Sequence, residues 1–155
     1  MPSRLQAEIK QTRPFPRRTT EALLSILRTA AVLDHHLGEA LKPFGITPTQ
    51  HNVLRILRGA GATGLCGREI GERMVARVPD VSRLLDRLEA MQLISRQRDP
   101  ADRRHVTAWI TRKGLDLLEI VGPELEAVER SRLGRLSEDA LASLIDSLAA
   151  VRDVT

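Results

Sequence analysis

The sequence has few aromatic residues, one cysteine and no long run of apolar residues. Phe15, Phe44 and Trp109 are its only Phe, Tyr or Trp residues, so aliphatic side chains must fill any core. The single Cys66 excludes an internal disulfide framework and agrees with a reducing compartment. The sequence contains no run of 18 apolar residues, so it predicts no membrane span. The N-terminus also lacks the apolar core of a secretion signal. We therefore expect a mainly helical, cytoplasmic protein with no membrane partner.

Length and charge narrow the class of protein. The chain has 155 residues and is 42% apolar, which suits one compact domain. Its net charge is +4, but residues 114–155 hold four basic and nine acidic groups, so the positive charge belongs to the rest of the chain. Such an asymmetry is typical of a protein that faces a polyanion with its basic part, although a merely solvated surface gives the same counts.

Periodicity predicts three long helices outside the central region. Residues 1–18 include Pro2, Pro14 and Pro16 and show no sustained apolar period, which predicts a basic arm that is flexible or only locally ordered. Beyond it, apolar residues recur every three to four positions in three segments: 19–42, 112–133 and 137–152. Thr111 and Ser137 can cap the second and third of these helices. The third is expected to bury Leu141, Leu144, Ile145, Leu148 and Val151.

The central region, residues 47–111, begins with a helix-turn-helix pattern. Thr47 offers a helix cap with Pro48 at the first helical position, and a short helix is predicted from Gly67 to Met74. After the break VARVP, Pro79 is predicted to open a further helix that buries Val81, Leu84, Leu85 and Leu88. Its outer face would then carry Asp80, Ser82, Arg83, Asp86 and Arg87, and Pro79 at the helix start is a candidate DNA-binding residue with them.

A hairpin with a charged tip is predicted next. Leu93–Arg98 and His105–Thr111 flank the polar turn DPADRR, and the second segment alternates between apolar and polar residues, as a half-buried strand does. Trp109 falls on the polar side of this strand, where it either packs under a neighbouring helix, the favoured interpretation, or lines an interface. The tip carries Arg98, Asp102, Arg103 and Arg104.

A helix with an exposed basic edge, followed at once by a basic hairpin, indicates binding to double-stranded DNA. A major groove admits such a helix, where Arg83 and Arg87 can donate to guanine edges or phosphates while Ser82 and Asp86 bond bases or fix the arginines. The arginines of the tip can then reach a minor groove or the backbone. Two alternatives stay open: the basic edge is only a solvated face, or it contacts a protein partner.

Residues 19–151 resemble the MarR family of winged-helix regulators. The resemblance rests on VSRLLDRLE at 81–89, DRR at 102–104 and ITRKG at 110–114. It implies a mainly α fold with a small β-hairpin wing, in which a winged helix-turn-helix at about 47–111 joins the long dimerisation helices in a single domain, 19–155. It also implies an obligate homodimer, a recognition helix at 79–91 and a wing at 93–111.

The resemblance also assigns roles to single residues. Ser82, Arg83 and Arg87 would face the major groove, Arg103 would enter the minor groove, and Asp102 would hold that arginine. The chain departs from the family at Gln92, where such proteins usually have glycine, so Gln92 must close the recognition helix without it.

The function predicted from these patterns is that of a sequence-specific, DNA-binding transcriptional regulator, a homodimer on a pseudo-palindromic operator. Family resemblance adds repression and control by a small aromatic or anionic effector. The alternative is a winged-helix module for protein interaction. We expect no cofactor.

Other chemistries are disfavoured by the sequence. Cys66, between Leu65 and Gly67, is interpreted as a small buried residue rather than a redox sensor. The neighbours His35 and His36 point in different directions on a helix, so they, Asp34 and His51 do not predict a metal site. The sequence has neither a nucleophile motif nor a phosphate-binding glycine loop, so it does not predict an enzyme.

Overall fold

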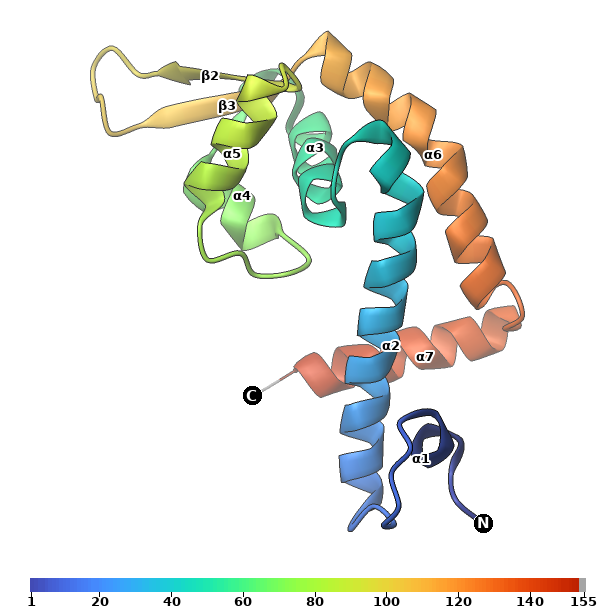
Figure 1. The fold of residues 1–155 in the computed structure, drawn as a ribbon. Helices are drawn as coiled ribbons and strands as arrows, with labels where there is room; N and C mark the ends of the chain where they lie inside the picture. The colour runs from blue at the N-terminus through green and yellow to red at the C-terminus, as the bar shows by residue number, and fades with distance from the viewer. Residues whose placement is uncertain (154–155) are drawn as a thin grey trace.

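The computed structural model describes residues 1–153, and in it helices form most of the molecule beside one small sheet (Figure 1). The helices are α1 (Arg4–Glu8), α2 (Arg18–Leu41), α3 (Pro48–Ala60), α4 (Gly67–Arg73), α5 (Val81–Ala90), α6 (Arg112–Leu133) and α7 (Glu138–Arg152), with 3-10 turns at Lys42–Phe44 and Gly61–Thr63. The strands are β1 (Leu65–Cys66), β2 (Ile94–Arg98) and β3 (Val106–Ile110). The predicted mainly helical fold with a hairpin wing is confirmed. Within residues 1–153, no helix combines the length and hydropathy that a membrane crossing needs.

The start of α3 follows from the local sequence. Gly45 takes a left-handed conformation with φ 75° and turns the chain after α2. Thr47 then accepts a hydrogen bond from the Gln50 amide, while the Gln50 side chain accepts one from the Thr47 amide. Pro48 occupies the first helical position, where it lacks only an amide that would have no helical partner. Both predicted features of this helix end are confirmed.

The sheet has three antiparallel strands in the order β1-β3-β2, so it exceeds the predicted hairpin by one short strand. Gly64, just before β1, has φ +64°, and a Cβ there would lie 2.6 Å from Nε1 of Trp109. Trp109 is half-buried, and its Nε1 donates to the carbonyl of Ala62 at 3.0 Å. The indole therefore packs against the turn before β1, in agreement with the favoured interpretation.

An aliphatic core joins the central helices to the sheet. Leu54 and Leu57 of α3, Ile70 of α4, Leu88 of α5 and Val121 of α6 are all completely buried in it. The DNA-binding elements predicted from the sequence are therefore fixed to one packed body. In Figure 1 the β2–β3 hairpin projects from this body with α5 beside it, while α1 and α7 lie toward the other end of α2.

The long helices leave apolar side chains uncovered. No residue of α7 is buried, so the expected burial of its apolar face is wrong for the single chain. Exposed apolar side chains occur on α2, on α6 and in or next to α7: Leu23, Leu27, Ile120, Leu136, Leu144, Ile145 and Val151. A chain this short has too few elements to cover all three helices by itself.

The N-terminal segment has local order. Ser3 and Gln6 form a reciprocal cap at the start of α1, and the Gln6 side chain also donates to the Arg13 carbonyl at 3.0 Å. Leu5 and Gln6 are buried. The structure thus gives residues 4–8 a capped helix, while the flexibility expected of residues 1–18 stays a prediction.

Candidate nucleic-acid interface

Helix α5 turns three leucines inward and its polar residues outward. Asp80 caps the helix by accepting a hydrogen bond from the Arg83 amide at 2.9 Å, and the first helical residue is Val81. The prediction that Pro79 occupies the first helical position is therefore wrong, because the capping carboxylate of Asp80 sets the start two residues later. Leu84, Leu85 and Leu88 pack into the core, as predicted, which leaves the polar residues exposed: Ser82, Arg83, Asp86 and Arg87.

The end of α5 is closed by a left-handed glutamine. Gln92 has φ 62° and donates its amide to Glu89, while the Leu93 amide reaches back to the Leu88 carbonyl at 3.0 Å. This is the hydrogen-bond pattern of a Schellman motif, in which glycine is the usual residue. The substitution of glutamine for glycine therefore leaves the geometry of the helix end intact.

The first turn of α6 also holds the end of α5. Lys113 Nζ donates to the carbonyl of Met91 at 2.9 Å, and the Thr111 hydroxyl donates to the carbonyl of Gln92 at 2.7 Å. The same hydroxyl caps α6 by accepting from the Gly114 amide, as predicted. These contacts satisfy carbonyls at the end of α5 and tie its position to the long helix α6.

Arg96 of β2 connects the wing to α5. Its guanidinium donates to Asp86 and to Glu89, each at 2.6 Å, and its side chain is only 21% exposed. Asp86 and Glu89 are the two acidic residues within α5, so one arginine engages both. The sequence-based idea that Asp86 fixes an arginine is right in kind, but the arginine is Arg96 rather than Arg83 or Arg87.

The tip of the wing is shaped by its aspartates. Asp99 accepts from the Ala101 amide at 2.8 Å, and Asp102 accepts from the Arg104 amide at 3.0 Å. Asp102 thus holds the backbone of the turn, and among residues 1–153 it makes no ion pair with Arg103, contrary to the role that the resemblance implied.

The predicted arginines stand free on this side of the molecule. Arg83, Arg87, Arg98, Arg103 and Arg104 are all exposed, and within the described part of the chain none of these five has a carboxylate at ion-pair distance. The first two lie on α5, and the other three lie at or near the tip of the adjoining hairpin (Figure 1). Their guanidinium groups remain available to a polyanion.

Cys66 caps α4 at the edge of the sheet. Its amide donates to the Glu69 carboxylate at 2.9 Å, and its sulfur accepts from the Glu69 amide. The hydrogen bond from the Cys66 amide to the Glu69 carboxylate, and then one from the Cys66 thiol, lower the pKa of Glu69. The sequence analysis interpreted Cys66 as a small buried residue. In the structure it is half-buried and caps helix α4.

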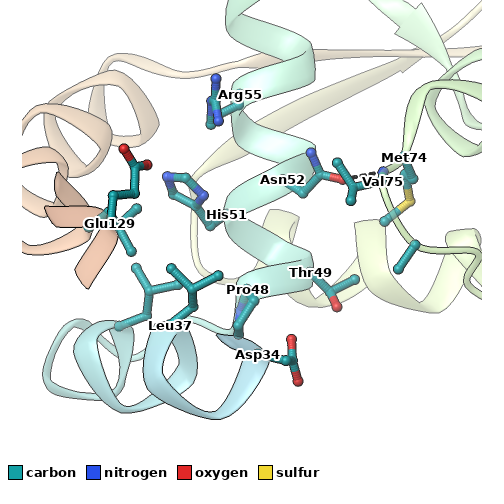
Figure 2. A pocket seen from close by; sticks show the side chains of 13 residues that line it. Asp34, Leu37, Pro48, Thr49, His51, Asn52, Arg55, Met74, Val75 and Glu129 are labelled. Atoms are coloured by element: carbon teal, nitrogen blue, oxygen red, sulfur yellow. Dashed lines mark hydrogen bonds between the residues drawn. The ribbon is translucent and has the colours of Figure 1, made fainter. Parts of the chain in front are cut away.

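A cavity of about 240 Å³ lies where α2, α3, α6 and the segment after α4 meet (Figure 2). Leu37, Leu41 and Leu125 give it an apolar wall, and Arg55 stands at its rim. Burial of the His51 imidazole, together with the nearby Arg55 and Arg58, lowers its pKa. His51 is therefore neutral at pH 7 and offers one donor and one acceptor. The family resemblance implied a cleft between the dimerisation helices and the DNA-binding part, but the lining residues could not be named from the sequence because they come from four separate segments.

Comparison with known proteins gives the arrangement a family. The model of the MarR family matches residues 46–106. The HTH-type transcriptional regulator MhqR of Bacillus subtilis (strain 168) is 26% identical over 134 residues, which cover 86% of this chain and 91% of that protein. The crystal structure of a MarR transcription factor from Planctomyces limnophilus matches with 32% identity and a TM-score of 0.69, over 88% of this chain and 98% of the other.

A third relative has been solved with nucleic acid. The structure of a MepR–DNA complex from S. aureus matches with 26% identity and a TM-score of 0.73, over 84% of this chain and 94% of the other. The Planctomyces limnophilus and S. aureus matches both extend well beyond residues 46–106, so the likeness includes helices outside the winged helix-turn-helix. From this likeness in sequence and fold we conclude that the chain belongs to the MarR family of transcriptional regulators.

Proposed function

We propose that this chain binds double-stranded DNA sequence-specifically and represses transcription. Helix α5 enters a major groove, where Ser82, Arg83 and Arg87 face base edges and phosphates. The observation that carries this proposal is the Arg96 ion pair, because it engages the acidic residues of α5 and leaves Arg83 and Arg87 without a carboxylate partner among residues 1–153. The charge that this helix presents outward is therefore basic.

The wing supplies the second set of contacts. Arg98, Arg103 and Arg104 reach the sugar-phosphate backbone or the adjacent minor groove, where the negative potential of DNA attracts arginine. Asp102 and Asp80 support the contacts indirectly, the first through the turn of the wing and the second through the start of α5.

The binding unit is a homodimer. The exposed apolar residues of α2, α6 and α7 support this, because a second copy of the chain would cover the apolar side chains that these helices leave exposed. A two-fold dimer presents two α5 helices to two successive major grooves on one side of the duplex. The operator is then a pseudo-palindrome with half-site centres about 10 base pairs apart.

Selection of bound duplexes from random DNA with the purified protein tests the proposal. The selected sequences should show dyad symmetry, and footprinting should show two equivalent protected major grooves. A selected site without dyad symmetry, or half-sites separated by half a turn, contradicts the proposed geometry.

Salt dependence separates this function from protein interaction through the same face. Several phosphate contacts make the affinity for duplex fall steeply with salt concentration, whereas an interface with an apolar centre lacks that dependence. A flat salt titration would favour the interaction module.

A small aromatic or anionic effector is proposed to control binding from the cavity beside α3. The apolar wall suits a ring, and Arg55 supplies one positive charge in a lining that also holds the carboxylates of Asp34 and Glu129 (Figure 2). Release of a fluorescent operator when such a molecule is added, followed by anisotropy, tests this control.

A further inference from the structure

The chain that leaves α5 lies against the first turn of α6 (Figure 1). Three consecutive backbone carbonyls there, those of Met91, Gln92 and Leu93, accept hydrogen bonds from the start of α6. Lys113 Nζ donates to the first carbonyl at 2.9 Å. The Thr111 hydroxyl donates to the second at 2.7 Å, and the Thr111 amide donates to the third at 3.0 Å. These three hydrogen bonds are called the joint below.

A glycine lets the two elements come this close. Gly114 is buried in the first turn of α6, and a Cβ on it would overlap the carbonyl oxygen of Leu93 and lie 2.7 Å from Cγ1 of Ile110. The Thr111 hydroxyl also accepts the Gly114 amide, so one side chain caps α6 and holds the chain after α5. Packing and hydrogen bonds together therefore limit the movement of the end of α5 against α6.

Lys113 is the charged member of the joint. Its side chain is exposed, and within residues 1–153 it has no carboxylate at ion-pair distance. Its ammonium group lies at the carboxyl end of α5, where the helix dipole attracts a positive charge. The protein itself therefore uses this charge, whereas Arg83 and Arg87 on the outer face of α5 stay available to DNA.

We propose that Lys113 is a positioning residue for DNA recognition: through the Met91 carbonyl it sets the angle of α5 on α6, and thereby the spacing of half-sites that the dimer accepts. The proposal rests on the proposed function, since it concerns how a dimer meets its operator. Ile120 of α6 is among the exposed apolar side chains that a second copy would cover. The joint therefore lies on the direct route from the dimer to each α5.

The spacing of half-sites is the property that the joint should control. Insertion of one base pair between them moves one major groove by about 3.4 Å along the duplex and rotates it by about 35°. A rigid joint follows this change only by giving up contacts with DNA, whereas a loosened joint follows it more easily. Loss of the Lys113 hydrogen bond should therefore reduce the penalty for the insertion, which is the ratio of the affinities for the selected and the lengthened operator.

The test compares Lys113→Met with Lys113→Arg and Arg112→Met in the full-length protein. Methionine removes the donor, arginine keeps one, and Arg112→Met removes a charge next in sequence, from a side chain that pairs with Asp116 at 3.0 Å on α6 itself. Lys113→Met should speed hydrogen–deuterium exchange in residues 88–93, at the end of α5. It should also weaken binding to the selected operator about threefold to tenfold.

Two further readouts separate positioning from a direct contact with phosphate. In Lys113→Met the penalty for the inserted base pair should fall about threefold to tenfold. The salt slope should stay as in wild type, because that slope counts the phosphates that the protein neutralises. Lys113→Arg and Arg112→Met should keep the wild-type penalty. A slope flattened by about one unit, with equal losses on both operators, would make Lys113 a phosphate contact and refute the positioning role.

The joint and the proposed function fail in different ways. If wild type selects no duplex, the proposed function is wrong and the control of spacing falls with it, while exchange in residues 88–93 still decides whether Lys113 holds the end of α5. If wild type binds its operator and Lys113→Met keeps the full penalty for the inserted base pair, DNA binding stands and the control of spacing is refuted.

Discussion

At the residue scale, the presence or absence of a carboxylate partner separates the arginines of this surface into two groups. Arg96 is engaged by Asp86 and Glu89 and is mostly covered, so its charge is already balanced. Arg83 and Arg103 are exposed and lack such a partner within residues 1–153. The first kind of arginine positions the wing, and the second kind is available for DNA.

Arg103→Ala tests the wing contact. The substitution should change the free energy of unfolding by less than about 0.5 kcal/mol, because the tip is exposed. DNA binding should weaken by about 1 to 3 kcal/mol and the salt slope should flatten by about one unit. Arg83→Ala is the comparison, since it should also relax base preference within the half-site. An operator affinity equal to wild type across a salt titration would remove Arg103 from the contacts.

Arg96→Gln tests the positioning role. Its ion pairs are partly exposed, so we expect a loss of at most about 1 kcal/mol in the free energy of unfolding. Operator affinity should fall about tenfold or more, about 1.4 kcal/mol, because the wing loosens and two carboxylates become free beside the DNA. Both quantities are measured, by urea denaturation and by anisotropy.

A second substitution separates the two causes of that loss. Adding Asp86→Asn to Arg96→Gln removes one free carboxylate and should restore part of the affinity, but not the part that depends on the position of the wing. Full recovery of the operator affinity would show that the freed carboxylate, and not the position of the wing, causes the loss in Arg96→Gln.

Sequence reasoning predicted the exposed arginines but not the ion pairs of Arg96. The period of the leucines in α5 is enough to place Arg83 and Arg87 outward, and the structure agrees. Arg96 escaped notice because its partners are ten and seven positions away on another element, and no local pattern predicts that distance. For Asp102, the resemblance implied a side-chain pair, whereas the structure shows a bond to the backbone.

At the element scale, helix ends were predictable where a cap decides them. Thr47, Thr111 and Ser137 each accept the expected amide hydrogen bond. The start of α5 was misplaced because both Pro79 and Asp80 are residues that begin helices, and the carboxylate prevailed. Strand β1 was missed because its two residues are too few to show a period.

Gln92→Gly tests the strain at the end of α5. A left-handed glutamine costs on the order of 1 kcal/mol, so glycine there should raise the free energy of unfolding by a similar amount. Gln97→Gly is the matched control, because it makes the same substitution at an exposed position in β2. Glycine within a strand should lower the free energy of unfolding by about 0.5–1 kcal/mol. Equal losses in both variants, measured in urea, would mean that Gln92 carries no strain.

At the scale of the whole molecule, the exposed apolar helices predict a dimer. Ile145 on α7 is 62% exposed, and Ile145→Glu should place a charge in the interface and yield monomers in analytical ultracentrifugation. Ser143→Glu changes the other face of the same helix and should leave the dimer intact. A monomeric wild type at micromolar concentration would refute the dimer and the two-groove mode of binding.

The absence of any buried residue in α7 has a consequence for how the protein folds. An isolated helix of 15 residues is marginal in water, so α7 needs a surface to pack on, and the proposed partner is the source of that surface. Folding of this end then becomes a second-order process. The melting temperature should rise with protein concentration, and a nascent chain at low abundance should stay incompletely folded until it meets another copy.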